Sequence, residues 1–400
     1  MKYIDELLKG HEVVWKELGE VFSLVTDFTA AGSFASNAAN VQYKQEKSFA
    51  QLVRTTDLKG KFKNTDKFVY VDEHAYEYLW RVNLNEECLV LSNVGNCGEV
   101  YYIIPEVLPY AHNVLGPNAL LLRTTLGMNK FFYYWFLNSS FQNELGKITS
   151  NTGQTKFNKT NLKKILIPLP PLSVQEEIVR ILDKFTTLEA ELEAELEAEL
   201  DCRKRQYEFY RNQLLSFENG AVEWKSLKEI AVNFDAMRKP ITSGAREKGT
   251  IPYYGASGVV DHVKGFIFDG DYLLVSEDGA NLIARTTPIA FSISGKSWVN
   301  NHAHVLKFNT YEERLFVEYY LNSIDLMPYI SGAAQPKLNQ RNLNKIKIPS
   351  PSLVVQQRIV TFLDKFDTLV NSISEGLPKE IELRRKQYEY YREQLLSFRH

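Results

Sequence analysis

An internal repeat constrains the fold of this chain more than any other feature. Residues 203–217 read RKRQYEFYRNQLLSF and residues 384–398 read RRKQYEYYREQLLSF, so eleven of fifteen positions are identical. Upstream, residues 152–188 and 333–369 share a glutamine, a lysine, an Asn-Leu pair, two prolines and an Asp-Lys-Phe triplet. The offset between equivalent positions is the same in all these blocks. Because self-similarity at a fixed offset marks repeated architecture, the sequence predicts two copies of one structural unit.

The segments between the repeated blocks predict two long helices. LEAELEAELEAEL (188–200) and LVNSISEGLPKEI (369–381) differ in sequence but place apolar residues four apart at equivalent positions. This spacing keeps the apolar residues near one helix face. Since a whole domain lies between the helices, we expect them to pair antiparallel. We expect the first helix to run from Ser173, as an N-cap with Glu176 completing a capping box, to Leu215. The second helix is expected to kink near Gly376 and Pro378.

The apolar stripe of these helices is a candidate surface for pairing and for docking partner subunits. Its predicted residues are Ile178, Leu182, Phe185, Leu192, Leu196, Leu200, Tyr207, Tyr210, Ile359, Leu363, Phe366, Ile373, Leu377, Ile381, Tyr388 and Tyr391.

A second repeat marks the starts of two globular parts. VVWKELGEV (13–21) resembles VEWKSLKEI (222–230), and YIDELLKG (3–10) resembles the helix end YRNQLLSF (210–217). We therefore predict an α+β chain in which two mixed α/β domains are separated by two long antiparallel, coiled-coil-like helices in a pseudo-two-fold ring. The expected divisions are residues 1–165 (with 1–11 as a helix tail), 166–217, 218–346 and 347–400.

The charge distribution favours a phosphate-contacting surface in each half. The formal net charge is −2, which by itself gives no general attraction to nucleic acid. Residues 145–175, however, contain five lysines and no acid, and residues 326–363 contain five basic residues and no acid. These two segments, called here the basic strips, occupy equivalent places in the repeat. Their recurrence favours contacts with phosphates over a merely solvated surface.

Motifs for catalysis and cofactors are absent from the sequence. It has no GxGxxG, P-loop, HExxH or CxxC motif, and its three cysteines lack metal-site or disulfide-framework spacing. His302 and His304 could form a metal pair, although packed or base-facing histidines are favoured because no further ligands are nearby. Glu277 and Asp278 are more typical of a turn than of a catalytic pair. Without a membrane-spanning run or signal peptide, a cytoplasmic location is expected.

Loop residues with amide, basic or tyrosine side chains are candidates for DNA contact, because such groups suit base edges and phosphates. The predicted DNA-binding residues are Lys147, Gln154, Lys156, Lys159, Arg238, Lys239, Arg246, Tyr253, Tyr254, Asn281, Asn300, Asn301, His302, Gln335, Lys337 and Arg341.

The chain resembles the specificity subunits of Type I restriction–modification systems, and its four-residue EAEL repeat resembles the Type IC group. The resemblance is carried by LPPLSVQEEIVRILDKF, its second copy, WKSLKEI, FDGDYLLVSEDGA and VNNHAHVLKF. It implies a non-catalytic prokaryotic protein whose two target-recognition domains each read half of an asymmetric, bipartite DNA target. It also implies that two methyltransferase subunits dock on the helices. These partners would bind S-adenosylmethionine and methylate adenine N6, and restriction subunits using ATP and Mg would cut unmodified DNA.

Two other interpretations stay open at the level of sequence. A self-contained DNA-modifying enzyme is disfavoured by the missing cofactor motifs. A two-domain coiled-coil adaptor that binds protein or sugar suits the acidic helix but not the two basic strips.

Overall fold

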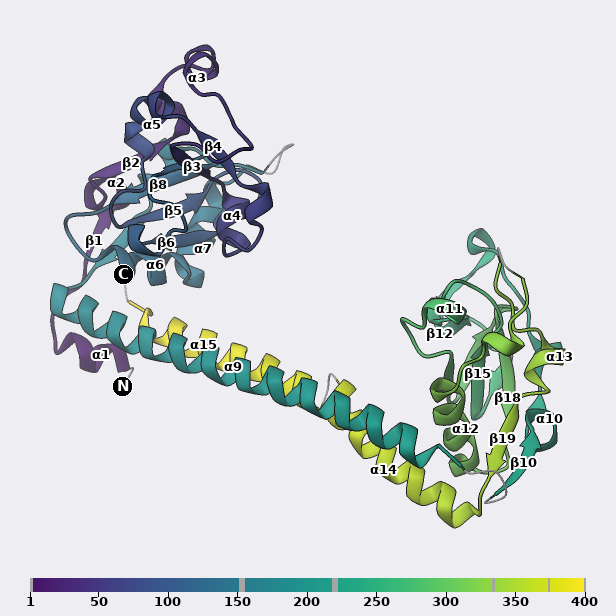
Figure 1. Ribbon diagram of the computed structural model, residues 1–400. Helices are drawn as coiled ribbons and strands as arrows, with labels where there is room; N and C mark the ends of the chain where they lie inside the picture. Colours follow the sequence, from purple (N-terminus) through teal and green to yellow (C-terminus); the bar gives the residue numbers. More distant parts are fainter. Residues whose placement is uncertain (1–2, 151–154, 218–221, 333–334, 373–374, 399–400) are drawn as a thin grey trace. The chain divides into compact units, whose positions relative to one another are not determined.

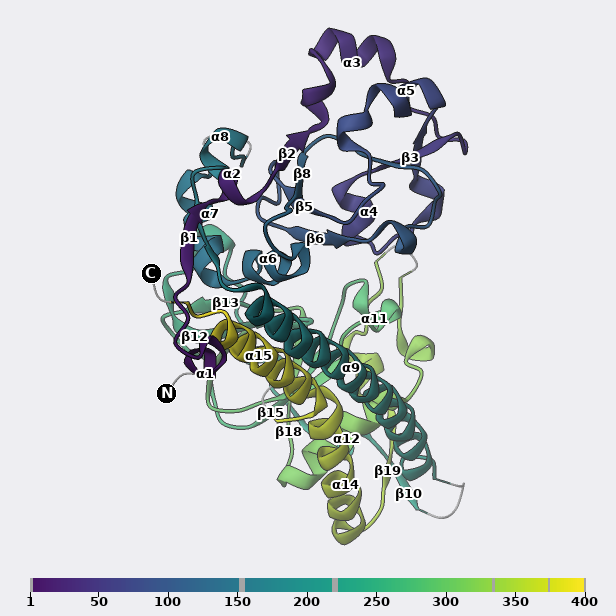
Figure 2. The ribbon, with the colours of Figure 1, turned by 90° about the vertical axis from the view of Figure 1, so that its left-hand side faces the viewer.

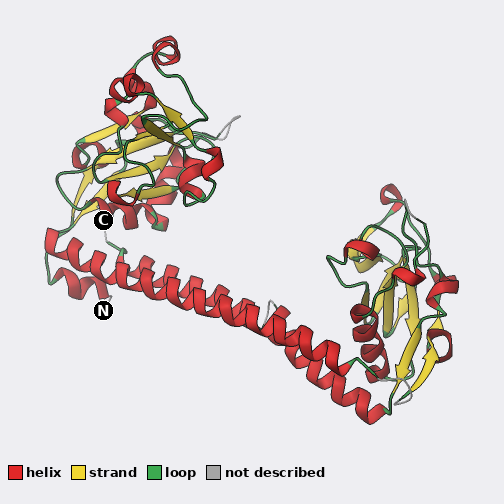
Figure 3. Cartoon of the chain, viewed as in Figure 1, coloured by secondary structure: helices red, strands yellow, loops and turns green. Residues whose placement is uncertain are grey.

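The computed structural model describes residues 3–150, 155–217, 222–332, 335–372 and 375–398. The chain forms two compact units (Figure 1). Unit 1 comprises Met1–Glu193 and Leu383–His400, and unit 2 comprises Ala194–Glu382. Each unit joins a mixed α/β domain to helical segments, and one long helix, α9 (Leu172–Leu214), lies between the domains in the chain (Figure 3). The predicted fold class is confirmed.

Besides a two-stranded ladder at its base, the described part of the domain of unit 1 contains a four-stranded and a three-stranded sheet. An antiparallel sheet has the order β2 (Leu24–Asp27), β8 (Ala119–Arg123), β5 (Cys88–Ser92) and β6 (Val100–Ile103). The other has the order β4 (Val69–Val71), β3 (Ala50–Val53) and β7 (Asn113–Leu115). The surrounding helices are α2 (Leu18–Val21), α3 (Phe34–Asn40), α4 (Thr55–Lys59), α5 (Glu73–Tyr78), α6 (Asn129–Phe136) and α7 (Ser139–Ile148). All five residues of β5 are buried, as expected for a continuous apolar run in a central strand.

The domain of unit 2 repeats this plan with different sequences. Its antiparallel sheet has the order β11 (Val232–Asn233), β18 (Ala303–Lys307), β15 (Tyr272–Ser276) and β16 (Ala290–Ile293). A second sheet has the order β13 (Gly258–Val263), β12 (Lys248–Gly255), β17 (Lys296–Val299) and β14 (Phe268–Asp269). Its helices include α10 (Leu227–Ile230), α11 (Asn281–Ala284) and α12 (Tyr311–Ser323).

The two repeats build the same strand ladder at the base of each domain. β1 (Val14–Glu17) pairs antiparallel with β9 (Leu166–Leu169), which places Trp15 opposite Pro168. β10 (Glu223–Ser226) pairs in the same way with β19 (Lys347–Ser350), which places Trp224 opposite Pro349. The repeated tryptophan and proline motifs are therefore the two sides of one ladder, and this ladder joins the start of each domain to its end.

Short helices precede these ladders in both units. They are α8 (Lys159–Leu162) and α13 (Gln340–Leu343). Each has an asparagine N-cap, Asn158 or Asn339, whose side chain accepts a hydrogen bond from the third residue beyond it. Satisfying an otherwise unpaired N–H group stabilises the first turn.

The predicted start of the first long helix is wrong by about one residue. The backbone N–H groups of Val174 and Gln175 donate to the Pro171 carbonyl at 2.9 and 3.1 Å, so Pro171 caps the helix and Ser173 lies within its first turn. The position equivalent to Pro171 in the second repeat is Ser352, which is the N-cap of α14 (Leu353–Asn371). The cap therefore recurs by position and not by residue type, which is why the serine misled the prediction.

The predicted interruption of the second long helix is confirmed. The second long helix consists of two helices, α14 and α15 (Leu377–Leu395), which are separated around Gly376. A Cβ atom on Gly376 would clash with the backbone carbonyl oxygens of Thr368 and Leu369. Only glycine allows the chain to pass so close to its own preceding turn.

The helices pair antiparallel within each unit, as predicted. In unit 1, Phe185 of α9 stacks on Tyr391 of α15 at 5.9 Å between ring centroids, and further along α9 Glu193 forms an ion pair with Arg385. Residue numbers rise along one helix as they fall along the other, and Figure 2 shows α15 beside α9. In unit 2, Tyr210 of α9 contacts Phe366 of α14 at 6.0 Å. Since Tyr210 is equivalent to Tyr391, and Phe366 to Phe185, the same contact is made twice with the repeats exchanged.

Both ends of the chain contribute to the core of unit 1. Ile4 of α1 (Tyr3–Leu8) and Leu395 and Leu396 of the C-terminal repeat belong to one buried cluster. Phe398 contacts Phe131 there at 6.1 Å, whereas the equivalent Phe217 contacts Phe316 in unit 2 at 6.2 Å. The C-terminal repeat, rather than residues 3–10, thus makes the contact in unit 1 that residues 210–217 make in unit 2.

Among the helices of the described residues, none is both long enough and apolar enough to cross a membrane.

Candidate nucleic-acid interface

The two basic strips share a pair of internal backbone hydrogen bonds and one backbone bond to their domain. In unit 2, Ser331 and Lys337 exchange backbone hydrogen bonds of 2.9 and 2.8 Å, and Leu338 N donates to Glu277 O at 2.8 Å. In unit 1, Ser150 and Lys156 exchange equivalent bonds of 2.9 and 3.2 Å, and Phe157 N donates to Asn93 O at 3.2 Å. Each strip therefore lies against the loop that follows the central strand, β15 or β5.

An open cavity of about 680 Å³ lies beside the strip of unit 2. Its lining comes from loops, from helix α11 and from the basic strip, and comprises Asp278, Gly279, Ala280, Ile283, Ala284, His302, Gln335, Pro336 and Lys337. His302 and Asp278 form a partly exposed pair, with His302 Nδ1 2.9 Å from both carboxylate oxygens. Gln335 and Lys337 are exposed on the other side. The cavity thus brings three predicted DNA-binding residues together with donors and acceptors suited to base edges.

A buried network of charged side chains lies next to this cavity and shares Lys337 with it. His304 of β18 is fully buried, with Nδ1 2.5 Å from Asp235 Oδ2 and Nε2 2.7 Å from the Leu338 carbonyl. Glu277 accepts a hydrogen bond of 2.6 Å from Arg238 Nη1 and forms an ion pair of 3.1 Å with Lys337. The network therefore ties the central strands directly to residues 337 and 338 of the basic strip.

The network keeps its carboxylates ionised. Burial alone would raise the pKa of Asp235, but the hydrogen bond and charge of His304 and the Val305 N–H outweigh it, so the pKa lies below its ordinary value. Burial also acts to raise the pKa of Glu277, and Arg238, His304 and Lys337 together lower it. Both side chains are therefore anions at neutral pH.

The side chains of Asp235, Glu277 and His304 come close enough to share a metal ion, with one ligand atom of each within 4.8 Å of the others. The surroundings do not favour one. Arg238 and Lys337 already compensate Glu277, and both ring nitrogens of His304 face oxygen acceptors within the chain. We therefore assign the cluster to structure. The alternative metal pair of His302 and His304 is not favoured, because both ring nitrogens of His304 already face oxygen acceptors.

Several predicted DNA-binding side chains are built into the domain of unit 2. Arg238 belongs to the buried network. The Tyr253 ring is 1% exposed, and its hydroxyl accepts from Ile241 N at 2.9 Å. Arg246 lies over that ring at 4.5 Å and forms an ion pair of 3.1 Å with Asp261. DNA contact by these three side chains stays a prediction, and it would require these bonds to open.

Other predicted residues shape or border the surface. Asn281 holds the loop at residues 286 and 287 through its side-chain amide, and Asn300 accepts from His302 N at 2.8 Å. Tyr254 is half-buried, and burial raises its pKa. Lys239 and Asn301 are exposed.

The predicted lysines of unit 1 differ in whether their charges are paired with a carboxylate. Lys147 forms an ion pair with Glu144 at 2.6 Å, and Lys159 with Asp27 at 3.0 Å. Lys156 is exposed, as is Arg341 in unit 2, and neither forms an ion pair within the described residues. Gln154 lies outside the described residues. Lys156, Arg341 and Lys239 are therefore predicted cations whose charges are exposed and not paired with a carboxylate among the described residues.

The predicted helical stripe has buried ends and a partly exposed middle. Ile178, Leu182, Tyr207, Ile359 and Leu363 are buried in the unit cores. The half-buried members are Leu192, Leu196, Leu200, Phe366, Leu377, Ile381 and Tyr388, and the more exposed ones are Phe185, Tyr210 and Tyr391. Ile373 lies outside the described residues.

Sequence reasoning missed two exposed aromatic residues on the helices. Phe209 of α9 is 62% exposed and the equivalent Tyr390 of α15 is 59% exposed. Each adjoins a more than one-third exposed tyrosine, Tyr210 or Tyr391. Their equivalent positions in the two repeats could have revealed them, because an exposed aromatic has no reason to recur unless both copies use it.

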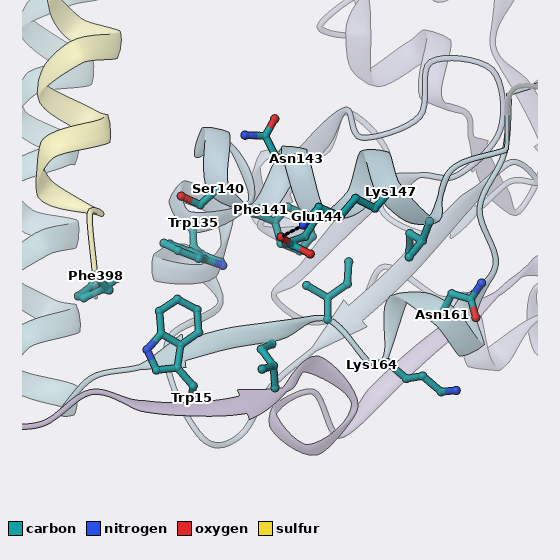
Figure 4. Close-up of a pocket in the computed structure, with 13 residues that line it drawn as sticks. Trp15, Trp135, Ser140, Phe141, Asn143, Glu144, Lys147, Asn161, Lys164 and Phe398 are labelled. Carbon is teal, nitrogen blue, oxygen red and sulfur yellow. Dashed lines mark hydrogen bonds and ion pairs between the residues drawn. The ribbon is translucent and has the colours of Figure 1, made fainter. Parts of the chain in front are cut away.

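A groove of about 1220 Å³ lies at the base of unit 1 (Figure 4). Its floor includes Trp15, Trp135 and Phe398, with Trp135 in contact with both other rings at 5.8 Å. The remainder of the lining mixes polar side chains, among them Asn143, Lys147 and Lys164, with apolar ones such as Ile165. The groove borders both the first strip and the repeated helix end.

Comparison with known proteins shows to which family the repeated sequence belongs. The sequence model of the "Type I restriction modification DNA specificity domain" matches residues 11–201 and again residues 220–383. The chain belongs to this family of specificity subunits. The domain match occurs twice, as the internal repeat predicts.

Similar proteins cover the whole chain. The EcoR124I/EcoR124II specificity subunit of Escherichia coli is 31% identical over 100% of this chain and 97% of its own length. The EcoprrI specificity subunit of Escherichia coli is 29% identical over 94% of this chain and 92% of its own length.

Solved structures share the fold at low identity. A chain from work on complex assembly and conformational transition of the type I R-M system has a TM-score of 0.66 at 14% identity, covering 96% of this chain and 98% of its own. The HsdS subunit of Thermoanaerobacter tengcongensis has a TM-score of 0.57 at 15% identity, covering 97% of this chain and 96% of its own. The structures show the shared fold, and the sequence matches give the chain the role of a DNA specificity subunit of a Type I restriction–modification system.

Proposed function

We propose that this chain reads an asymmetric, bipartite DNA target, with residues 1–165 reading one half and residues 218–346 the other. The observation that carries the proposal is the identical attachment of a basic strip to the central-strand loop in both units. The two loops themselves differ: Glu277 and Asp278 in unit 2 stand where unit 1 has Asn93 and Val94. A common phosphate-contacting frame with different base-facing side chains is suited to two different half-sites.

The helices would dock two copies of one methyltransferase subunit. The exposed aromatic pairs at 209–210 and 390–391 supply a matching patch in each unit. Aromatic side chains dominate the energetics of protein interfaces, and equivalent patches suit identical partners. The groove of unit 1 adds tryptophan and phenylalanine surface beside one patch.

Catalysis would lie in the partners. The methyltransferase subunits would hold S-adenosylmethionine, flip the target adenine out of the duplex and methylate its N6 atom. Restriction subunits with ATP and Mg would join the complex to cut unmodified DNA in the bacterial cytoplasm. This chain would supply only the recognition of the DNA target sequence.

The four-residue repeat of α9 allows a direct test of the bipartite target. Deleting residues 193–196 removes one EAEL unit, which corresponds to about 6 Å of helix. Since DNA rises about 3.4 Å per base pair, the gap between half-sites should shorten by one or two base pairs while both half-sites stay the same. Methylation sequencing of cells carrying the variant reads both quantities.

The matched control replaces residues 193–196 by Gln-Ala-Gln-Leu, which removes the negative charges but keeps the length. Its gap should equal that of the parent chain. An active deletion variant with an unchanged gap would show that the helix does not set the spacing.

A further inference from the structure

Unit 2 contains a second cavity, of about 370 Å³, away from the basic strip. It lies where α9, α12 and α14 meet the loop at residues 285–289. Arg211 from α9 and Arg285 from the loop both line it. Their surroundings indicate which chemical group they would bind.

Both arginines have a buried donor without a partner. Arg211 Nε and Arg285 Nη2 are shielded from solvent and meet no hydrogen-bond acceptor among the described residues. The Arg211 guanidinium lies over the Tyr207 ring at 5.5 Å, and Arg285 makes only a long bond of 3.4 Å to the Asn322 carbonyl. Neither arginine forms an ion pair with a carboxylate among the described residues, and both are only partly buried, so two cations without a paired carboxylate line one cavity.

The two positive charges are also close enough to repel. Burial lowers the pKa of Arg285, the charge of Arg211 lowers it further, and Asp325 opposes both effects. Arg285 moreover has a left-handed backbone conformation, with φ of +48°. Arg285 is the C-cap of α11, where a left-handed residue commonly ends a helix, and this places it at the start of the loop that lines the cavity. An anion between the guanidinium groups would offset the repulsion.

In unit 1 the arginine equivalent to Arg211 lies near a carboxylate of the chain itself. Arg392, equivalent to Arg211, lies over Tyr388 at 5.7 Å and is 3.9 Å from the Glu393 carboxylate. Glu393 in turn accepts hydrogen bonds from Asn138 and Ser139 at the start of α7. The Nε group of Arg392 also lacks an acceptor among the described residues, so the two units differ in the neighbouring charge and not in this donor. In unit 2 the residue equivalent to Glu393 is Asn212, which has no charge.

Two carboxyl groups line the cavity of unit 2, and neither replaces the missing anion fully. Burial raises the pKa of Glu318 to about 7, and Ser292 Oγ donates to its carboxyl group at 2.5 Å. Asp367 accepts a hydrogen bond of 2.8 Å from Asn371. When Glu318 is protonated, the two arginines face only one negative charge, so the lining carries a net positive charge.

We propose that Arg211 and Arg285 form a binding site for a phosphate-type oxyanion. The anion would sit between the two guanidinium groups, which can each donate two parallel hydrogen bonds to its oxygens. The phosphate could be free in solution or part of a nucleic-acid backbone. The site stands on the geometry of unit 2 alone and does not depend on the proposed DNA-reading function.

The test titrates inorganic phosphate into the full-length chain by calorimetry, at constant ionic strength maintained with sodium chloride. The variants are Arg285→Gln, Arg211→Lys and, as the matched control, Arg392→Gln. Because one hydrogen bond to a charged group contributes about 1.5–3 kcal/mol, Arg285→Gln should weaken phosphate binding about 10- to 100-fold. Arg211→Lys should weaken it less, and Arg392→Gln should bind as the parent does.

Phosphate that gives no heat beyond chloride would overturn the proposal. Equal binding by the parent and Arg285→Gln would overturn it as well, and so would equal losses in Arg285→Gln and Arg392→Gln. A non-specific DNA duplex added to the titration separates the two sources. Competition by the duplex identifies a nucleic-acid phosphate, and binding that the duplex leaves unchanged identifies free phosphate.

Discussion

Removing Asp235 from the buried network should destabilise unit 2 strongly. In Asp235→Asn the carboxylate that faces His304 Nδ1 at 2.5 Å and accepts from Val305 N at 2.8 Å becomes a neutral amide. His304 then loses the nearer of its two carboxylates, and the other, Glu277 at 3.8 Å, is shared with Arg238 and Lys337. Breaking a buried pair by removing one partner costs about 3–5 kcal/mol. We expect a loss of that size in the free energy of unfolding.

The matched control is Asp278→Asn, in the same neighbourhood. Asp278 pairs with His302 at 2.9 Å, but their side chains are 32% and 51% exposed. Pairs in contact with solvent contribute about 0–1 kcal/mol. Both variants remove a carboxylate that faces a histidine Nδ1 atom. Asp235 is the more buried of the two, and it also accepts from Val305 N and lies 3.5 Å from Arg238.

Urea unfolding monitored by circular dichroism measures the loss, and hydrogen exchange with mass spectrometry localises it. Exchange should accelerate in β18 of the Asp235→Asn variant, while β8 in unit 1 serves as an internal reference. A loss below about 1 kcal/mol, or equal losses in both variants, would refute the reasoning that burial makes this network important.

The same network gives a pH dependence with a definite sign. The pKa values of Asp235 and Glu277 are lowered in the folded chain. Their stabilisation is therefore fully present above the ordinary carboxyl pKa of about 4 and is lost as pH falls through the lower folded values. Between about pH 5 and pH 3 the parent should lose stability more steeply than Asp235→Asn. Parallel slopes in urea titrations at several pH values would contradict this.

Three further changes test other parts of the structure. Gly376→Ala should destabilise the chain by about 1–3 kcal/mol in urea unfolding, because the added Cβ meets backbone carbonyl groups; an unchanged midpoint would contradict the close approach. Lys156→Ala should weaken binding to all DNA sequences and reduce the slope of log affinity against log salt by about 0.9, whereas an unchanged slope would remove Lys156 from the interface. Tyr390→Ala should weaken the binding of one methyltransferase copy about ten-fold or more, seen by native mass spectrometry as complexes with one partner instead of two. Equal weakening of the binding of both methyltransferase copies would contradict separate docking patches.

The repeated frame could be predicted from the sequence because it is local and written twice. The constant offset and the shared apolar spacing predicted both long helices. The domain between them predicted their antiparallel pairing, and Gly376 with Pro378 predicted the interruption. The start of α9 was misplaced because Ser173 has the side chain of an N-cap, whereas the proline carbonyl at 171 takes that position. Residue preference is weaker evidence than position within a repeat.

The candidate site could be predicted only in part, because burial depends on contacts between distant residues. Arg238 and Lys337 look like similar loop cations in the sequence, yet Arg238 lies within the buried network and Lys337 at its exposed edge. Glu277 was assigned to a turn, although it anchors both cations. Arg211 and Arg285 lie far apart in the sequence, and no local pattern indicates that they share a cavity.

Base-resolution methylation sequencing tests the central claim most directly. Cells carrying the intact locus are compared with cells that lack only this gene. The account predicts an asymmetric, two-part N6-methyladenine motif that disappears with the gene, and its halves and gap are read from the same data. Identical methylation in both strains, with the partner genes intact and expressed, would contradict the assignment of this chain as the subunit that reads the DNA target.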